Sequence, residues 1–262
     1  MHEHHQQTIE KAKAHFEADS SIEALLLCGS IAHGYANAES DIDVLILLSD
    51  EDHAKRESEG LPMTLYDPSL ATYEGGYVDG KYISKAFIRQ VIARGSEPAR
   101  YAFDGVEILF NRTDGLEDLL KEAATYPTAE KNDRIIKFHA QFEAWKWFCC
   151  EAKKKNNPYL LNMAVSKLVL FGTRLILAYN ELLYPFHKWM LKVLEGAKEK
   201  PEGMVEAAEK LCREPTSENI EAFYNLVKSF RKWEGDPKTW SYRFLMDVEL
   251  TWMDGWTSVD DI

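Results

Sequence analysis

Two short aliphatic runs near the start of the chain constrain its fold more than any other feature. They read ALLLC at residues 24–28 and IDVLILL at residues 42–48, and glycine or polar residues follow each of them. Short runs with so little polar alternation are typical of strands that are buried on both faces of a sheet. Helices have to cover such a sheet, so we expect an N-terminal region that mixes strands and helices.

The segments around these runs support that expectation. Residues 7–18 and 84–95 have the spacing of helices, while 75–83 and 106–111 read as two further strands. Strands that are interleaved with helices in this way predict a mixed sheet.

The second half of the chain has a different character. Its apolar residues follow a helical spacing, as in the stripe that includes Phe138 and Phe142, and almost no strand-like alternation is present. We therefore predict an α+β protein in which a mixed-sheet domain (1–115) is followed by a helical bundle (116–262). The aromatic tail is expected to pack against the rest of the chain.

Composition narrows the class of protein. The net charge of −12 disfavours binding to nucleic acid, because phosphate backbones require basic patches. The N-terminal segment is polar, and no apolar run approaches the ~20 residues of a membrane-spanning helix. The four cysteines show no framework spacing. These features predict a cytoplasmic protein with no membrane partner.

A glycine–serine pair follows the first aliphatic run directly. Gly29 lets the backbone turn sharply and lets another group approach closely. If a helix begins at Ser30, its free N–H groups and the serine hydroxyl form a ready anion site that suits a phosphate.

Two aspartates stand at the entrance to the second run. Asp41 and Asp43 are two residues apart on a predicted strand, so their carboxylates project from the same face. A hard divalent cation between them would remove their mutual repulsion, and Mg²⁺ is the usual choice beside phosphates. The order strand, Gly-Ser, ten residues, Asp-x-Asp, strand therefore predicts a metal held next to a polyphosphate.

The segment CGSIAHGYANAESDIDVLI resembles the signature of the DNA-polymerase-β-like nucleotidyltransferase superfamily, most closely its small-molecule and minimal branches, which include the aminoglycoside and lincosamide adenylyltransferases. The resemblance implies that Gly29 and Ser30 bind a nucleoside triphosphate and that Asp41 and Asp43 ligate Mg²⁺. It also implies that the helical half (116–262) binds the substrate.

The family usually has a third carboxylate on a neighbouring strand. Asp79, in GYVDGKYI, is the best candidate for a metal ligand or general base, although its Asp-Gly pair is also a hairpin signal. Asp67 and Glu74 are the alternatives. The chain departs from many minimal members at His33, where they carry arginine, so that His33 either contacts phosphate or caps the loop.

Two residues of the helical half are candidates for substrate contacts. In the antibiotic adenylyltransferases a lysine of the helical domain often reaches the triphosphate, and by similarity Lys188 is expected to do so, with Tyr184 lining the acceptor site. The alternative is an ordinary helix–helix corner with Lys188 in solvent. At the other end of the chain, the histidines of MHEHH are expected to lie in a frayed terminus.

These inferences predict a Mg²⁺-dependent enzyme that moves AMP from ATP onto a hydroxyl of a small molecule. The best-supported class of acceptor is an antibiotic of the aminoglycoside or lincosamide kind. One alternative keeps the chemistry but makes the acceptor a protein, as in antitoxin-type minimal nucleotidyltransferases. The other is an inactive homologue that binds nucleotide as a sensor, against which the intact Ser30, Asp41 and Asp43 argue.

Overall fold

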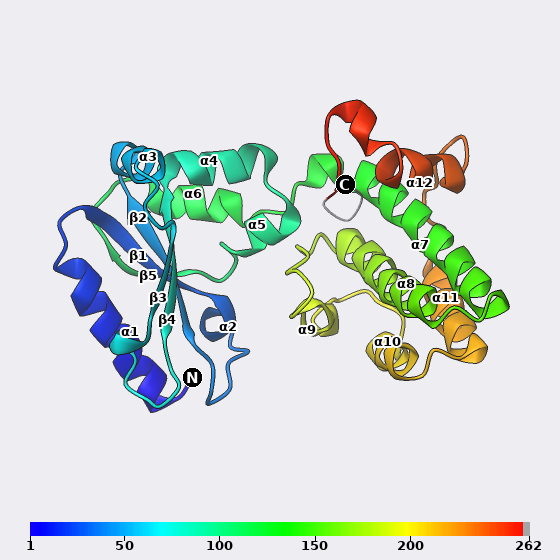
Figure 1. The fold of residues 1–262 in the computed structure, drawn as a ribbon, viewed down its shortest axis with the longest axis horizontal. Helices are drawn as coiled ribbons and strands as arrows, with labels where there is room; N and C mark the ends of the chain where they lie inside the picture. The colour runs from blue at the N-terminus through cyan, green and yellow to red at the C-terminus, as the bar shows by residue number, and fades with distance from the viewer. Residues whose placement is uncertain (259–262) are drawn as a thin grey trace. The chain divides into compact units, whose positions relative to one another are not determined.

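The computed structural model describes residues 1–258. The chain forms two compact units, the first from Met1 to Thr125 and the second beginning at Tyr126 (Figure 1). The helices and strands of the first unit, in chain order, are α1 (Glu3–Glu17), β1 (Ile22–Cys28), α2 (Gly29–Ala32), β2 (Ile42–Leu48), α3 (Asp50–Ser58), β3 (Thr64–Asp67), the 3₁₀ turn η1 (Pro68–Leu70), β4 (Val78–Ser84), α4 (Lys85–Arg94), α5 (Glu97–Tyr101), β5 (Glu107–Asn111) and α6 (Leu116–Ala123).

The five strands form one mixed sheet in the order β3-β4-β2-β1-β5. β2 and β4 pair in parallel, whereas β1–β2, β1–β5 and β3–β4 pair antiparallel. The predicted mixed sheet is thus confirmed, and the two aliphatic runs are its central strands β1 and β2. β3, an edge strand of four residues, was not predicted.

Each face of the sheet has its own apolar core. Alternate residues of β1 and β2, such as Leu25 and Val44, pack with α1 on one face, where Phe16 is buried. Their neighbours, such as Leu26 and Leu45, pack with α4 and α6 on the other face (Figure 1). This strict alternation fixes the direction of every side chain on the central strands, including those of the polar residues at their ends.

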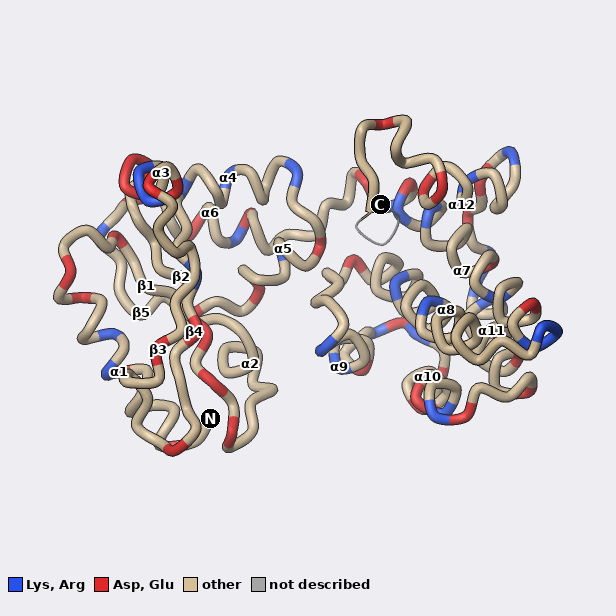
Figure 2. Tube along the Cα trace, viewed as in Figure 1, with Lys and Arg blue, Asp and Glu red and all other residues tan. Residues whose placement is uncertain are grey.

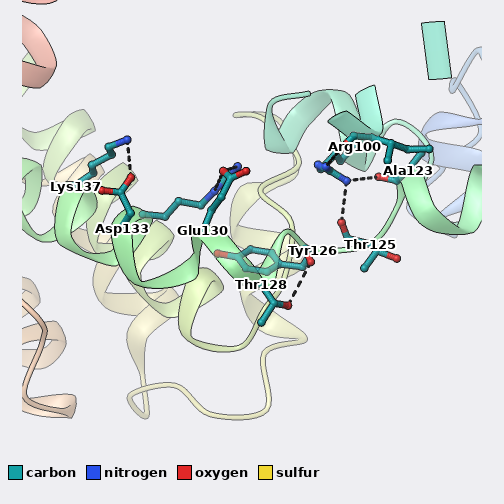
Figure 3. Close-up of polar contacts among 10 residues, drawn as sticks. Arg100, Ala123, Thr125, Tyr126, Thr128, Glu130, Asp133 and Lys137 are labelled. Carbon is teal, nitrogen blue, oxygen red and sulfur yellow. Dashed lines mark hydrogen bonds and ion pairs between the residues drawn. The ribbon is translucent and has the colours of Figure 1, made fainter. Parts of the chain in front are cut away.

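The segment after β5 belongs to the first unit. α6 (Leu116–Ala123) buries Leu116 and Leu120 in the core of the α4 face. The buried guanidinium of Arg100 donates hydrogen bonds to the carbonyl oxygens of Ala123 (3.4 Å) and Thr125 (3.2 Å), as Figure 3 shows. The division between the units therefore lies ten residues beyond the predicted 115/116 boundary, because these contacts hold the chain to the sheet as far as Thr125.

The second unit is helical, as predicted. Phe142, Leu168 and Phe223 are fully buried between its helices, and Gly172 lets the two phenylalanine rings approach the backbone of α8 closely. Phe244 anchors α12 against Trp145 of α7, which matches the expected packing for this part of the aromatic tail, whereas Trp252 and Trp256 are exposed. The helices are α7 (Lys131–Lys154), α8 (Pro158–Tyr179), α9 (Met190–Glu195), α10 (Met204–Arg213), α11 (Ser217–Phe230) and α12 (Trp240–Val248), with 3₁₀ turns η2 (Thr128–Glu130) and η3 (Thr251–Asp254).

α8 is long and apolar enough to cross a membrane by length and composition alone, contrary to the expectation that no apolar run approaches that length. Of its most apolar stretch, 56% is buried inside the unit. A mostly buried helix of this kind is typical of the core of a soluble helical bundle.

The N-terminal histidines are not frayed, contrary to the sequence prediction. α1 begins at Glu3, and His5 is fully buried. His4 Nε2 lies 3.0 Å from the carbonyl oxygen of Ala38, in the loop that leads to β2. The histidine rings pack against one another and against Tyr73, so the terminus supports the loop ahead of Asp41.

Candidate active site

Parallel pairing of β2 and β4 brings three aspartates together. In this register Asp43 lies directly opposite Asp79, and Asp41 precedes the first residue of β2. Three carboxylate oxygens, one from each aspartate, lie within 4.8 Å of one another. All three side chains are partly exposed. Acidic positions along β2 and β4 are seen beside α2 in Figure 2.

The carboxylates occupy the open end of one face of the sheet. Asp43 alternates with Ile42 and Val44, so it shares its face with Leu45 and Leu47, which are buried further along the strand under the α4 face core. The site is thus built on inner strands of the sheet, yet it remains accessible.

The three side chains suit a hard divalent cation. Ionised carboxylates this close repel one another, and a cation that prefers oxygen ligands would bind all three and remove the repulsion. The set contains no sulfur or imidazole ligand, which fits Mg²⁺ better than a softer transition metal.

Gly29 packs directly against this cluster. Its φ of +67° lies in the left-handed region, and a Cβ atom built on it would fall 1.9 Å from Oδ2 of Asp43. Only glycine leaves room for the carboxylate there. Ser30 is buried within α2, a single turn that begins at Gly29 rather than at Ser30.

Cys28 lies opposite Asp43 in the β1–β2 ladder. Burial, reinforced by the charge of Asp43, raises the pKa of its thiol to about 12. The thiol therefore stays neutral and serves as packing beside the cluster.

A family model matches the part of the chain that carries these residues. Residues 10–95 match the family model described as polymerase beta, nucleotidyltransferase, and this span contains β1, α2, β2 and β4. Residues 10–95 belong to the DNA-polymerase-β-like nucleotidyltransferase superfamily. The match covers both the Gly-Ser pair and the three aspartates.

Among solved structures, one match is the crystal structure of a nucleotidyltransferase-like protein from Exiguobacterium sibiricum 255-15 at 1.90 Å resolution. The similarity spans 86% of this chain and 72% of that chain, with 13% sequence identity and a TM-score of 0.44. The comparison with curated proteins gave no match.

Within this nucleotidyltransferase domain, His33 holds the turn at Gly29. Its Nδ1 lies 2.8 Å from the Gly29 carbonyl oxygen, and its Nε2 lies 3.4 Å from Oδ2 of Asp104. Its ring stacks on Tyr101, with centroids 4.6 Å apart and planes 6° apart. The Asp104 carboxylate and the Gly29 carbonyl raise the pKa of His33. Of the two roles that the sequence left open, the structure favours the cap.

Tyr77 is a site residue that the sequence analysis missed. It stands two residues before Asp79, where strand alternation would have indicated the same face. A hydrogen bond to the Asp41 carboxylate raises the pKa of Tyr77 to about 12, so its hydroxyl remains a donor at neutral pH. Tyr77 thereby orients Asp41.

The alternative third carboxylates lie elsewhere. Asp67 ends β3 and accepts hydrogen bonds from the backbone N–H (2.8 Å) and hydroxyl (2.6 Å) of Ser69, which lower its pKa. Glu74 is exposed in the loop before β4. Asp79 is the acid that meets Asp41 and Asp43.

The two candidates of the helical half lie on the segment between α8 and α9. Tyr184 is buried, and its hydroxyl lies 3.0 Å from Nδ1 of His187. Lys188 is exposed, and its Nζ lies 5.3 Å from the centroid of the Trp189 ring. Their contacts with a nucleotide or an acceptor stay predictions.

Proposed function

We propose that the protein transfers AMP from ATP onto a hydroxyl group of a small molecule. The observation that carries the proposal is the convergence of Asp41, Asp43 and Asp79 beside a glycine turn, within a nucleotidyltransferase domain. Three carboxylates that repel one another suit a divalent cation, and a cation held by them can in turn bind a polyphosphate.

Each residue of the cluster has a role in this proposal. The backbone of Gly29 and the hydroxyl of Ser30 bind the β- and γ-phosphates. Asp41 and Asp43 hold Mg²⁺, which when bound would supply positive charge at the α-phosphate. Asp79 accepts the proton of the acceptor hydroxyl while the oxygen of that hydroxyl bonds to the α-phosphorus, and pyrophosphate leaves.

Residues of the helical half are proposed to bind substrate, as the sequence resemblance implies. Lys188 has an exposed ammonium group, which we propose neutralises the triphosphate. For Tyr184, whose side chain is buried, the proposed role in the acceptor site rests on the sequence resemblance alone. An antibiotic of the aminoglycoside or lincosamide kind is the acceptor class that follows from the sequence resemblance. The cytoplasm, where ATP and Mg²⁺ are available, is the proposed location.

The test is incubation of the full chain with α-labelled ATP, Mg²⁺ and a panel of hydroxylated small molecules that includes both antibiotic classes. Label should move to one class of acceptor, with one pyrophosphate released per transfer. Label on the protein itself, or on added proteins, would favour the protein-modifying alternative. Binding of ATP without pyrophosphate release would favour a nucleotide sensor.

Asp41→Asn provides the matched control and the first prediction. Asparagine keeps the shape of the side chain but removes charge from the metal site, so transfer should fall by at least about 100-fold, which corresponds to several kcal/mol of lost electrostatic stabilisation. Because one of three repelling charges is gone, the melting temperature without metal should not fall. Turnover of Asp41→Asn at the wild-type rate would contradict the proposal.

A further inference from the structure

Two tyrosines that the proposed reaction does not use lie beside the carboxylates. Tyr66 on the edge strand β3 is paired with Asp79 in the β3–β4 ladder, so the two side chains project from the same face. Tyr66 is 68% exposed. Its ring lies 4.8 Å from that of Tyr77, at an interplanar angle of 40°. The two rings thus form an aromatic surface adjoining the acid cluster.

This surface is tied to the site rather than to the core. The hydroxyl of Tyr77 is bonded to Asp41, which fixes its ring next to the acids. The ring of Tyr66 is mostly in water and contributes little to the stability of the fold, because an exposed side chain buries little apolar area. An exposed ring beside a partly buried, hydrogen-bonded one presents a flat apolar face to a ligand.

The geometry of phosphoryl transfer indicates that the acceptor lies on the side of the acid cluster where the two tyrosines are. In an in-line displacement the attacking oxygen and the departing pyrophosphate lie on opposite sides of the α-phosphorus. The proposed phosphate turn at Gly29 follows β1, on one side of β2. β4, which carries Asp79 and directly follows Tyr77, and β3, which carries Tyr66, lie on the other side of β2.

We propose that Tyr66 and Tyr77 form a stacking platform for the acceptor, and that the acceptor is therefore a compound whose reactive hydroxyl is attached to a ring with a flat face. The inference rests on the proposed function, since it uses the direction of the transfer. Stacking holds the ring while Asp79 receives the proton of the hydroxyl. A sugar ring and an aromatic ring share this chemistry, and the acceptor panel separates them.

The first experiment compares Tyr66→Ala with Tyr66→Phe in the transfer assay, using saccharides, phenols and acyclic polyols as acceptors. Loss of one stacking ring should raise the acceptor KM of Tyr66→Ala about 5- to 150-fold. Tyr66→Phe should stay near the wild-type value, and the KM for ATP should be unchanged in both. An increase in the KM for ATP instead, or equal use of acyclic polyols, would overturn the proposal.

The second experiment does not depend on turnover. Tetranitromethane should nitrate Tyr66, and Tyr159, which is 75% exposed in the second unit, provides the internal control. Ring compounds of the panel should protect Tyr66 but not Tyr159, as read by mass spectrometry of peptides, while ATP with Mg²⁺ alone should protect neither. Protection by the nucleotide alone, or protection by no ring compound, refutes the platform.

The two proposals fail in different ways. Absence of transfer and of ATP binding in the wild-type chain would refute the nucleotidyltransferase reaction. Intact transfer with no effect of Tyr66→Ala and no protection of Tyr66 would refute only the platform.

Discussion

Gly29 shows how one missing side chain determines the geometry of the site. The position combines a left-handed backbone with a carboxylate that occupies the space of a Cβ atom. The sequence indicated a glycine turn there, and Asp41 and Asp43 could be paired from their spacing alone. The contact between Gly29 and Asp43 could not, because it depends on the pairing of β1 with β2.

Gly29→Ala should therefore reduce transfer by more than backbone strain alone explains. The new methyl group would push the Asp43 carboxylate out of the cluster, so transfer and metal binding should both fall at least about tenfold, the effect of losing roughly 1.4 kcal/mol. Gly34→Ala is the matched control, since Gly34 has a similar φ of +72° but no atom within 4 Å of the added Cβ. Equal effects of the two variants on metal affinity would show that strain, not the clash, is responsible.

The contact between His33 and Asp104 predicts a pH dependence of stability. Because the folded state raises the pKa of His33, the contact stabilises the fold fully below the unfolded value of about 6.5, and this contribution is lost as pH rises through the folded pKa. Asp104 is half exposed, so the contribution is about 1 kcal/mol or less.

Asp104→Asn should accordingly lower the melting temperature by a few degrees near pH ~5.5 and by much less near pH ~9. Glu59→Gln, at an exposed carboxylate that ends α3, controls for the general effect of one charge. Thermal melts at the two pH values provide the measurement, and a difference that grows with pH would contradict the assignment.

At the scale of elements, the strands and helices that could be predicted from the sequence are those with a recognisable pattern of apolar residues. β1 and β2 were recognisable because their apolar runs are buried, and β4 and β5 because their residue types suit strands. The parallel β2–β4 pair explains why Asp79 meets Asp43. α3 was missed because it buries no residue and so has no apolar period, and only its cap, Ser49, marks its start.

β3 was missed for a related reason. It is short, lies at the sheet edge and carries the exposed Tyr66, so it lacks the pattern of a buried strand. The aromatic platform could not be predicted, because it depends on the pairing of β3 with β4.

The helical unit depends on close packing at one position of α8. A Cβ atom on Gly172 would lie 2.8 Å from Phe223 and 3.0 Å from Phe142, and both rings are fully buried. Gly172→Val should therefore destabilise the unit by about 1–3 kcal/mol through overpacking, despite removing a helix glycine. Gly196→Ala, where the Cβ would meet only Val193 O at 3.4 Å, should be near neutral in urea unfolding. Equal stability of the two variants would show that the rings can move aside.

At the scale of the whole molecule, the two units should separate at Thr125. A fragment of residues 1–125 retains both cores of the sheet, including Leu116 and Leu120 on α6, and should be a soluble, cooperatively folded monomer. A fragment of residues 1–115 lacks α6 and exposes apolar surface on the sheet, so it should aggregate. Gel filtration and urea melts distinguish these outcomes, and a well-behaved 1–115 fragment would show that α6 is dispensable.

Because β2 pairs in parallel with β4, the stability of the protein should depend on the supply of divalent cations in the cell. The three aspartates come from strands that are joined by a long crossover, so the unfolded chain does not hold them together and presents no comparable chelating site. By mass action, a divalent cation that binds only the folded state adds about 1.4 kcal/mol to folding for each tenfold rise in its free concentration above its Kd. Depletion of that cation would then reduce the amount of folded protein as well as its turnover, and chelator-treated cells should contain less of the intact chain.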